Sequence, residues 1–464
     1  MTVRLVEVEF PEPMAPMEVP AIAKSVYDDR IKRAVGAMQE RGLSHLVVYA
    51  DREHFANMHF LTGYDPRFEE ALLVISPGNR PALFVGNEGM AYASISEVEM
   101  DVALCQSFSL MGQPRGKSPS LKQMLNDAGI ASGARVGMVG SKYYGPREVD
   151  DPEHATDVPG LIVDILRSLA GYENVVNAAD MFTNPVNGLR VCLNVDDIAF
   201  FEYGAEVVYS GVNRVLKGLR EGISALEASA LFGYAGYPPL SCHLTMSFGE
   251  RAMLGLASPS PGNKLKIGDF VNFGYGVWGA NMARSGFAVE NKDQLASETT
   301  GVVEDLYIPY FKMMARWYSS LAVGKAAGEV YEAVKDFVED QQYGVALNPG
   351  HLIHLDEWPH SPFSPGSTCE LRSGMAMQCD IISSTGAPYY GVHVEDGLVL
   401  ADAALRAELI SRYPATAERM QQRRRRFTET LGIRLSEDVL LMSSIQGVLS
   451  PYMLRPELAL GLQL

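Results

Sequence analysis

Imidazole and carboxylate side chains are concentrated between residues 348 and 395 of this 464-residue chain. The first part of this segment contains three histidines and two acids: His351, His354, His360, Asp356 and Glu357. Histidine titrates near neutral pH and therefore suits general acid–base catalysis; together with carboxylates it also binds divalent metal ions. The segment predicts an active site in which His351 or His354 acts as the base.

Two strand-like segments follow the histidines. In residues 374–382 apolar side chains alternate with polar ones that include Asp380, and in residues 391–396 the alternation places His393 beside Glu395. Because successive side chains of a strand point to opposite faces, each strand would have one acid-bearing face. Two such strands side by side predict the floor of a catalytic site, with a solvated edge face as the alternative. If the two carboxyl groups are close together, one of them should keep its proton and act as an acid.

The overall composition is that of a globular protein, with 47% hydrophobic and 20% charged residues. A formal net charge of -17 opposes binding to nucleic acids or anionic membranes. The five cysteines lack any CxxC spacing, which favours reduced thiols, and no segment has the length and apolarity of a leader or a membrane span. We therefore expect a cytoplasmic protein. The basic run 423–426 is expected to be a solvated helix face.

Hydrophobic patterning predicts the parts that must position these residues. Residues 1–24 form a proline-rich arm (Pro11, Pro13, Pro16, Pro20) that we expect to lie on another surface, for example that of a partner subunit. Residues 25–184 alternate helix and strand patterns, including a buried strand at 46–50 and a hairpin at 71–85, which indicates an α/β domain. Turn chemistry at 184–188 marks a boundary. Residues 185–464 place helices (198–215 and 224–231) before paired strands (268–276 and 281–289). This order predicts an α+β domain with helices over a curved sheet, followed by a C-terminal extension.

These segments resemble the pita-bread fold of the creatinase, prolidase and aminopeptidase P family. The matching motifs are Phe60-Leu-Thr-Gly-Tyr64, Gly268-Asp-Phe-Val271, Pro349-Gly-His351, Ser373-Gly-Met375 and Val394-Glu-Asp396. The resemblance implies an α+β protein in which a creatinase/prolidase-type α/β N-terminal domain precedes a pita-bread catalytic domain. It also implies a homodimeric hydrolase whose site is completed by the partner's N-terminal domain.

Metal-dependent members of the family hold two ions with two aspartates, one histidine and two glutamates. The corresponding positions of this chain carry Gly274, Asn281, His351, Asp380 and Glu395. Two adjacent cations need several anionic ligands, so the loss of two carboxylates argues against a paired site. We therefore predict no metal and no other cofactor.

Three functions are compatible with this degenerate site. The main prediction is metal-independent, creatinase-like hydrolysis of a C–N bond in a small amino-acid-like, amide or guanidino compound. The first alternative is a prolidase-like dipeptidase or aminopeptidase that uses a single ion held by His351, Asp380 and Glu395. The second alternative is a non-catalytic paralogue that binds a small ligand.

The candidate site residues have two predicted roles. The predicted catalytic residues are His351, His354, Asp380 and Glu395. The predicted substrate-binding residues are Arg67, Phe68, Asn272, Asn281, Arg284, His360 and His393. The amides can hydrogen-bond a carbonyl group, and Arg67 from a neighbouring subunit would bind a substrate carboxylate with both arms of its guanidinium group. For Arg284 a salt bridge to Asp380 or Glu395 is the alternative.

Overall fold

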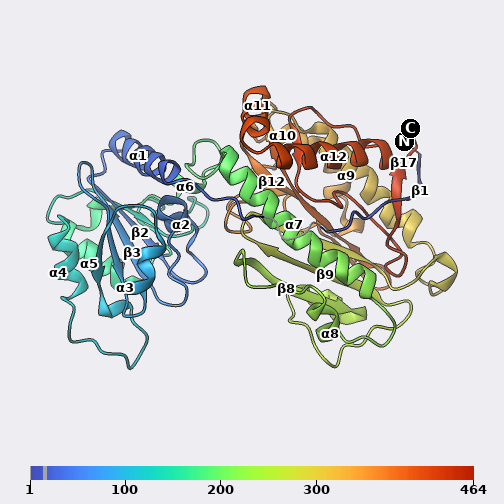
Figure 1. Cartoon of the computed structure of the whole chain (residues 1–464), viewed down its shortest axis with the longest axis horizontal. Helices are drawn as coiled ribbons and strands as arrows, with labels where there is room; N and C mark the ends of the chain where they lie inside the picture. Colours follow the sequence, from blue (N-terminus) through green and yellow to red (C-terminus); the bar gives the residue numbers. More distant parts are fainter. Residues whose placement is uncertain (1, 14–17, 464) are drawn as a thin grey trace. The chain divides into compact units, whose positions relative to one another are not determined.

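The computed structural model describes residues 2–13 and 18–463, so Pro16 of the predicted arm lies outside the described residues (Figure 1). The chain divides into two compact units, one of residues 22–191 and one that combines the N-terminal arm with residues 192–464. Residues 185–191 stay with the first unit because Leu189 and Arg190 donate backbone hydrogen bonds to Met181 and Phe182. No helix in the described part of the chain is long and apolar enough to cross a membrane.

The first unit is built on a six-stranded sheet with the strand order β5-β4-β3-β2-β6-β7. Its strands are β2 (His45–Ala50), β3 (Ala71–Ile75), β4 (Ala82–Val85), β5 (Asp101–Leu104), β6 (Val136–Val139) and β7 (Val175–Asn177). Its α-helices are α1 (Lys24–Glu40), α2 (Ala56–Thr62), α3 (Gly89–Tyr92), α4 (Leu121–Asp127), α5 (Gly160–Ala170) and α6 (Asp180–Thr183). Short 3-10 helices lie at Ala93–Ile95, Gln106–Phe108 and Tyr172–Asn174.

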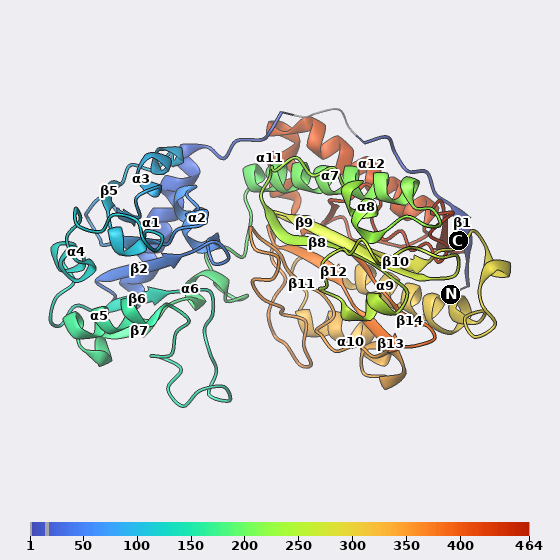
Figure 2. The ribbon, with the colours of Figure 1, turned by 90° about the horizontal axis from the view of Figure 1, so that it is seen from below.

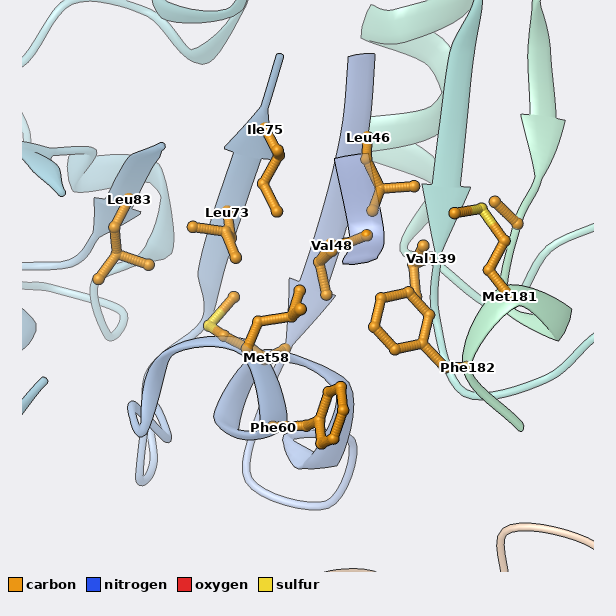
Figure 3. Close-up of a cluster of buried hydrophobic side chains, with 14 of the residues drawn as sticks. Leu46, Val48, Met58, Phe60, Leu73, Ile75, Leu83, Val139, Met181 and Phe182 are labelled. Atoms are coloured by element: carbon orange, nitrogen blue, oxygen red, sulfur yellow. The ribbon is translucent and has the colours of Figure 1, made fainter. Parts of the chain in front are cut away.

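Continuous apolar runs make the central strands of this sheet fully buried, because helices cover both faces. Figure 3 shows one of the two resulting cores, where Leu46 and Val48 of β2 lie beside Leu73 of β3 and near Met58 and Phe60 of α2. A second cluster on the other face includes Val47, Leu72 and Leu166. The predicted strand at 46–50 and the hairpin at 71–85 are present.

The second unit holds a seven-stranded antiparallel sheet in the order β11-β12-β15-β10-β9-β8, with β16 also paired to β15 (Figure 2). Its strands are β8 (Leu240–Phe248), β9 (Phe270–Val277), β10 (Ala280–Phe287), β11 (His351–Leu352), β12 (Ala376–Asp380), β15 (Val394–Leu400) and β16 (Val439–Leu441). A separate hairpin of β13 (Ser383–Gly386) and β14 (Tyr390–Val392) lies between β12 and β15 in the sequence.

The second unit also contains α-helices. They are α7 (Val195–Gly218), α8 (Ala225–Ala230), α9 (Ile308–Ser320), α10 (Ala327–Val338), α11 (Ala403–Arg412) and α12 (Pro414–Thr430). Helix α7 begins where the Asn194 side chain accepts hydrogen bonds from the backbone of Asp196 and Asp197, which is the capping expected for such a sequence. Shorter helical turns are η4 (Gly249–Leu254), η5 (Lys292–Gln294), η6 (Val303–Tyr307) and η7 (Gln341–Tyr343).

Two parts of the second unit differ from the prediction. The sequence analysis did not predict β8, a nine-residue strand at the edge of the sheet. The N-terminal arm was expected on another surface, such as a partner's, but β1 (Val3–Glu7) pairs antiparallel with β17 (Leu458–Leu462) of the same chain. The Tyr209 hydroxyl also donates a hydrogen bond to Pro11 of the arm. The arm is therefore part of this unit's own structure.

The prediction for the basic run 423–426 was wrong for its first residue. Arg423 is 2% exposed and forms ion pairs with Glu202 at 2.5 Å and Glu206 at 2.7 Å on α7. Arg419 also pairs with Glu202. A buried guanidinium group needs such anionic partners because the cost of removing it from water is large. These ion pairs join α12 to α7.

Candidate active site

Three neighbouring strands bring the predicted histidine and acids together. In the register of the sheet, His351 of β11 lies opposite Gln378, and Asp380 of β12 lies directly opposite Glu395 of β15. His351, Asp380 and Glu395 are all buried. Strand alternation predicted that the two acids share a face, and the antiparallel pairing of β12 with β15 makes them neighbours on it.

The side chains of these three residues converge on one point. His351 Nε2 lies 3.5 Å from Asp380 Oδ2 and 3.7 Å from Glu395 Oε1. One possible ligand atom from each residue lies within 4.8 Å of the other two. His351 Nδ1 lies 2.9 Å from the Leu352 carbonyl oxygen, which can only accept, so Nδ1 carries the hydrogen. Nε2 therefore points at the two carboxylates, and within the described residues it has no hydrogen-bond partner.

Neighbouring side chains hold the two acids in place. His393 Nε2 lies 2.8 Å from Asp380 Oδ1. Asn281 of β10 donates from Nδ2 to Glu395 Oε1 at 3.1 Å and to Glu357 Oε1 at 2.9 Å. These contacts give each carboxylate a fixed orientation, as supporting residues do around a metal or catalytic site.

Trp358 covers the imidazole ring of His351. Their ring centroids are 4.0 Å apart with an interplanar angle of 18°, which is a stacked arrangement. Trp358 is 39% exposed, whereas His351 is fully buried beneath it. The indole ring therefore restricts both the rotation of the imidazole and the access of water to its face.

Burial and charge shift the pKa values of these groups in different directions. Burial favours neutral His351, but Asp380 and Glu395 outweigh it and raise the His351 pKa to about 10. Burial and the nearby Asp380 charge raise the pKa of Glu395 to about 7. Burial also acts to raise the pKa of Asp380, but hydrogen bonds from His351 and His393 lower it overall. The three groups are therefore coupled: the carboxylates stabilise a proton on His351, and Asp380 makes Glu395 harder to ionise.

A cavity of about 210 Å³ opens over these groups. Its polar lining consists mainly of Cys242, Thr245, Asn272, Asn281, Glu357, Asp380, His393 and Glu395. The predicted residues Asn272, Asn281, Asp380, His393 and Glu395 therefore line one cavity of the second unit.

Gly274, which the resemblance assigned to the position of the family's first aspartate, also lines this cavity. A Cβ atom there would lie 2.7 Å from the Met282 carbonyl oxygen and 2.9 Å from Ala283 Cβ. Both contacts are too close for any side chain without a shift of β10. A carboxylate at this position would therefore require the backbone of β10 to move.

Two of the predicted histidines, His354 and His360, lie elsewhere. The His354 ring packs edge-on against Phe201 of α7, with centroids 5.4 Å apart, and is not part of the described cavity lining. Its predicted role as the base is therefore not supported by its position. His360 also lies outside this lining, and its backbone carbonyl accepts a hydrogen bond from Leu352. Burial lowers the pKa of His360.

Arg284 occupies the opposite face of β10. Its Nη2 atom lies 2.8 Å from both carboxylate oxygens of Asp396, and the pair is almost completely buried. The prediction that Arg284 binds substrate, and the alternative salt bridge to Asp380 or Glu395, are both corrected by this pairing. The physical reason is alternation, which points 281 and 283 into the cavity and 284 away from it.

Arg67 and Phe68 belong to the first unit. Arg67 has a positive φ of 63° and lies 3.7 Å from Asp65, and Phe68 is 56% exposed. Their predicted part in a site completed by a partner subunit stays a prediction.

Sequence reasoning missed the contributions of β8 and of Trp358. Cys242 and Thr245 reach the cavity from this unpredicted strand. Glu357 also lines the cavity, although it was not among the predicted site residues. The run Leu240–Phe248 mixes Ser, Cys, His and Thr with apolar residues, so its periodicity is weak. The sequence signal that could have found Trp358 is its position only seven residues after His351, in the same histidine-rich segment.

The donor set fits a single divalent metal ion. Ligand atoms about 2.0–2.2 Å from a tetrahedral ion lie roughly 3.3–3.6 Å apart. The measured separations of 3.5 Å and 3.7 Å from His351 Nε2 are close to that spacing. The buried Nε2 lacks a hydrogen-bond partner among the described residues, and the two carboxylates supply the negative charge that such an ion requires.

Comparisons with known proteins agree with this arrangement of strands. Residues 30–143 match the family model of the Creatinase/Prolidase N-terminal domain. A Xaa-Pro dipeptidase from Bacillus anthracis has a similar structure, with a TM-score of 0.61 and 15% identity, covering 82% of this chain and 96% of that one. The chain carries a creatinase/prolidase N-terminal domain and has the fold of the prolidases.

Other solved structures support the same conclusion. A prolidase from Thermococcus sibiricus gives a TM-score of 0.62 at 16% identity and covers 81% of this chain and 95% of its own. An X-Pro aminopeptidase from Thermotoga maritima gives 0.58 at 15% identity, covering 81% and 96%. No curated protein sequence matches this chain. The prolidase-like fold extends over both units, which confirms the predicted α+β pita-bread fold preceded by an α/β domain.

Proposed function

We propose that this protein is a prolidase-like hydrolase that cleaves a C–N bond in a small peptide-like compound with a single divalent metal ion. His351, Asp380 and Glu395 would hold the ion. The proposal is supported by the convergence of their ligand atoms, which all lie within 4.8 Å of one another. Nε2 of His351 is also buried and has no hydrogen-bond partner in the described part of the chain. One histidine and two carboxylates form a ligand set suited to divalent transition metals.

When bound, such an ion supplies Lewis-acid polarisation of a scissile carbonyl group. The chain's own residues prepare the site for it. The Leu352 carbonyl fixes the tautomer of His351, His393 orients Asp380, and Asn281 orients Glu395. Trp358 shields the imidazole from water, which strengthens the electrostatic interactions beneath it.

Metal-independent hydrolysis is the second candidate function. Gly274 and Asn281 favour it, since they leave two of the family's carboxylate positions without charge. A single ion is compatible with the same two residues, because it needs fewer anionic ligands than a pair. The single-ion function is therefore preferred, and the absence of a metal stays a prediction.

Metal analysis of protein purified without added metals tests the proposal. We expect about one manganese, zinc, cobalt or iron ion per chain, and loss of hydrolysis of Xaa-Pro dipeptides after chelation. His351→Ala should lose the ion. His360→Ala is the matched control, because His360 lies outside the described lining of the cavity, and it should keep the ion. Turnover that persists in fully chelated protein would favour the metal-independent mechanism instead.

The quaternary structure is a separate part of the proposal. We expect a homodimer in which Arg67 and Phe68 of one subunit contact the substrate of the other. Sedimentation velocity of the wild-type protein measures the first expectation. Mixing an Arg67→Ala protein with a His351→Ala protein measures the second, because a mixed dimer would regain one intact site.

A further inference from the structure

The cavity over the candidate ion site has an acidic floor and apolar walls. The walls include Met253, Leu256, Phe270, Ile382 and Tyr390. Met253 and Leu256 are 42% and 75% exposed, and Ile382 is 36% exposed. Apolar side chains that remain in contact with water beside a polar site favour a ligand with a hydrocarbon group, since the ligand then removes that surface from water.

The charge of the cavity is one-sided. None of the described residues that line it is an arginine or a lysine, whereas three of them are acids: Glu357, Asp380 and Glu395. The basic group His393 is already engaged with Asp380. The Arg284 guanidinium group faces Asp396 on the other side of the sheet. Among the three acids of the described lining, Glu357 is therefore the one without a basic side chain in contact with it, and a cationic ligand group would be attracted to it.

Glu357 differs from the other two acids. Asp380 and Glu395 both face the imidazole of His351, but Glu357 accepts one hydrogen bond from an amide, that of Asn281, and has no ion pair with any described residue. It is partly exposed and lines the cavity. Burial raises the pKa of Glu357, although a hydrogen bond from Cys242 and the charges of His351 and His243 act to lower it. The Cys242 thiol lies beside it, and burial followed by the charge of Glu357 raises the pKa of that thiol.

We propose that Glu357 binds the protonated amine of a small substrate whose neighbouring side group is apolar and packs against the cavity walls. The proposal rests on the proposed function, because it assigns a substrate class to the same cavity. An ammonium group can donate to the Glu357 oxygen that Asn281 does not contact. It would give Glu357 the cationic partner that no described residue provides, while His351, Asp380 and Glu395 would hold the ion that polarises the scissile carbonyl group. The cavity requires no carboxylate on the substrate.

Three probes of one shape test this proposal on the full-length protein: benzylamine, benzyl alcohol and benzoate, which are cationic, neutral and anionic at pH 7. Isothermal titration calorimetry measures their binding to wild type and to Glu357→Gln. The glutamine keeps the volume and can still accept from Asn281. We expect benzylamine to bind wild type more tightly than benzyl alcohol or benzoate does, and about tenfold or more weakly to Glu357→Gln. The affinity for benzyl alcohol should change little.

Several results would overturn the inference. These are no binding of benzylamine to wild type, equal affinity of both proteins for it, or tighter binding of benzoate than of benzylamine. Failure of benzylamine to bind wild type overturns the inference even if Glu357→Gln fails to fold. Metal analysis of the same samples separates the two proposals. Binding of benzylamine through Glu357 by a protein that holds no ion would support this inference and contradict the single-ion function.

Discussion

Replacing Asn281 by aspartate tests how much negative charge the site tolerates. Asn281 Nδ2 donates to Glu357 Oε1 at 2.9 Å and to Glu395 Oε1 at 3.1 Å. Asn281→Asp keeps the size of the side chain but turns both hydrogen bonds into contacts between carboxylate oxygens. It also restores the residue type of the metal-dependent family members at this position.

The expected destabilisation follows from these distances. Two unit charges about 3 Å apart repel each other by roughly 5 kcal/mol at an effective dielectric constant of about 20. A carboxyl group can avoid this by keeping its proton, which costs roughly 4 kcal/mol at pH 7 for a group with an ordinary pKa. Glu395, with a pKa of about 7, can take a proton at less cost. We therefore expect the chelated variant to lose about 2–3 kcal/mol in its free energy of unfolding.

Urea unfolding at pH 7, with EDTA and then with manganese, measures this effect. Manganese should stabilise Asn281→Asp more than wild type, because the ion neutralises the added charge. Asn272→Asp is the matched control: it adds the same charge to the same cavity, and the Asn272 amide oxygen has no hydrogen-bond partner among the described residues. An Asn281→Asp protein as stable in EDTA as wild type, or no more sensitive to manganese than the control, would refute the reasoning.

Three further predictions concern buried charges. Asp396→Asn should lower the free energy of unfolding by about 3–5 kcal/mol in urea titrations, because it leaves the Arg284 guanidinium group buried without its anion. Burial acts to raise the pKa of Glu202, but Arg423 and Arg419 lower it overall. The ionised Glu202 carboxylate therefore stabilises the fold above its unfolded pKa of about 4.5, and this stabilisation is lost as the pH falls through the lower pKa of the folded state. Glu202→Gln should therefore destabilise the protein at pH 7, and urea titrations over a series of acidic pH values should show this loss shrinking as the pH falls through the folded pKa of Glu202. His351→Asn should weaken metal binding at least tenfold in competition with a chelating dye, while an unchanged affinity would argue against His351 as a ligand.

Local patterning predicted the part of the site that depends on strand geometry. Asp380 and Glu395 were expected on one face and His393 beside Glu395, because side chains alternate with a period of two in any strand. The paired strands at 268–289 and the helices near 195 and 225 were also predicted, since caps and apolar periodicity are encoded within each segment. The motif Pro349-Gly-His351 located the buried imidazole.

Contacts between distant segments could not be predicted in the same way. Periodicity places Arg284 on a strand but does not identify its partners. These are Asp396 on β15 and the backbone carbonyl of Ile445, and both reach Arg284 only because these segments pack against β10. The charge on Arg423 suggested exposure, whereas the acids of α7 pair with it across more than 200 residues of sequence. Local propensity says nothing about such partners.

The sequence by itself determined which residue types are available to the site: several histidines, and two acids that each lie on the polar face of a strand. The tertiary structure decided which of them meet. It turned His354 towards Phe201, stacked Trp358 on His351, and placed Glu357 in the cavity without a described ion pair. The physical reason is that side-chain direction within a strand is a local property, whereas burial and charge pairing depend on which segments pack together.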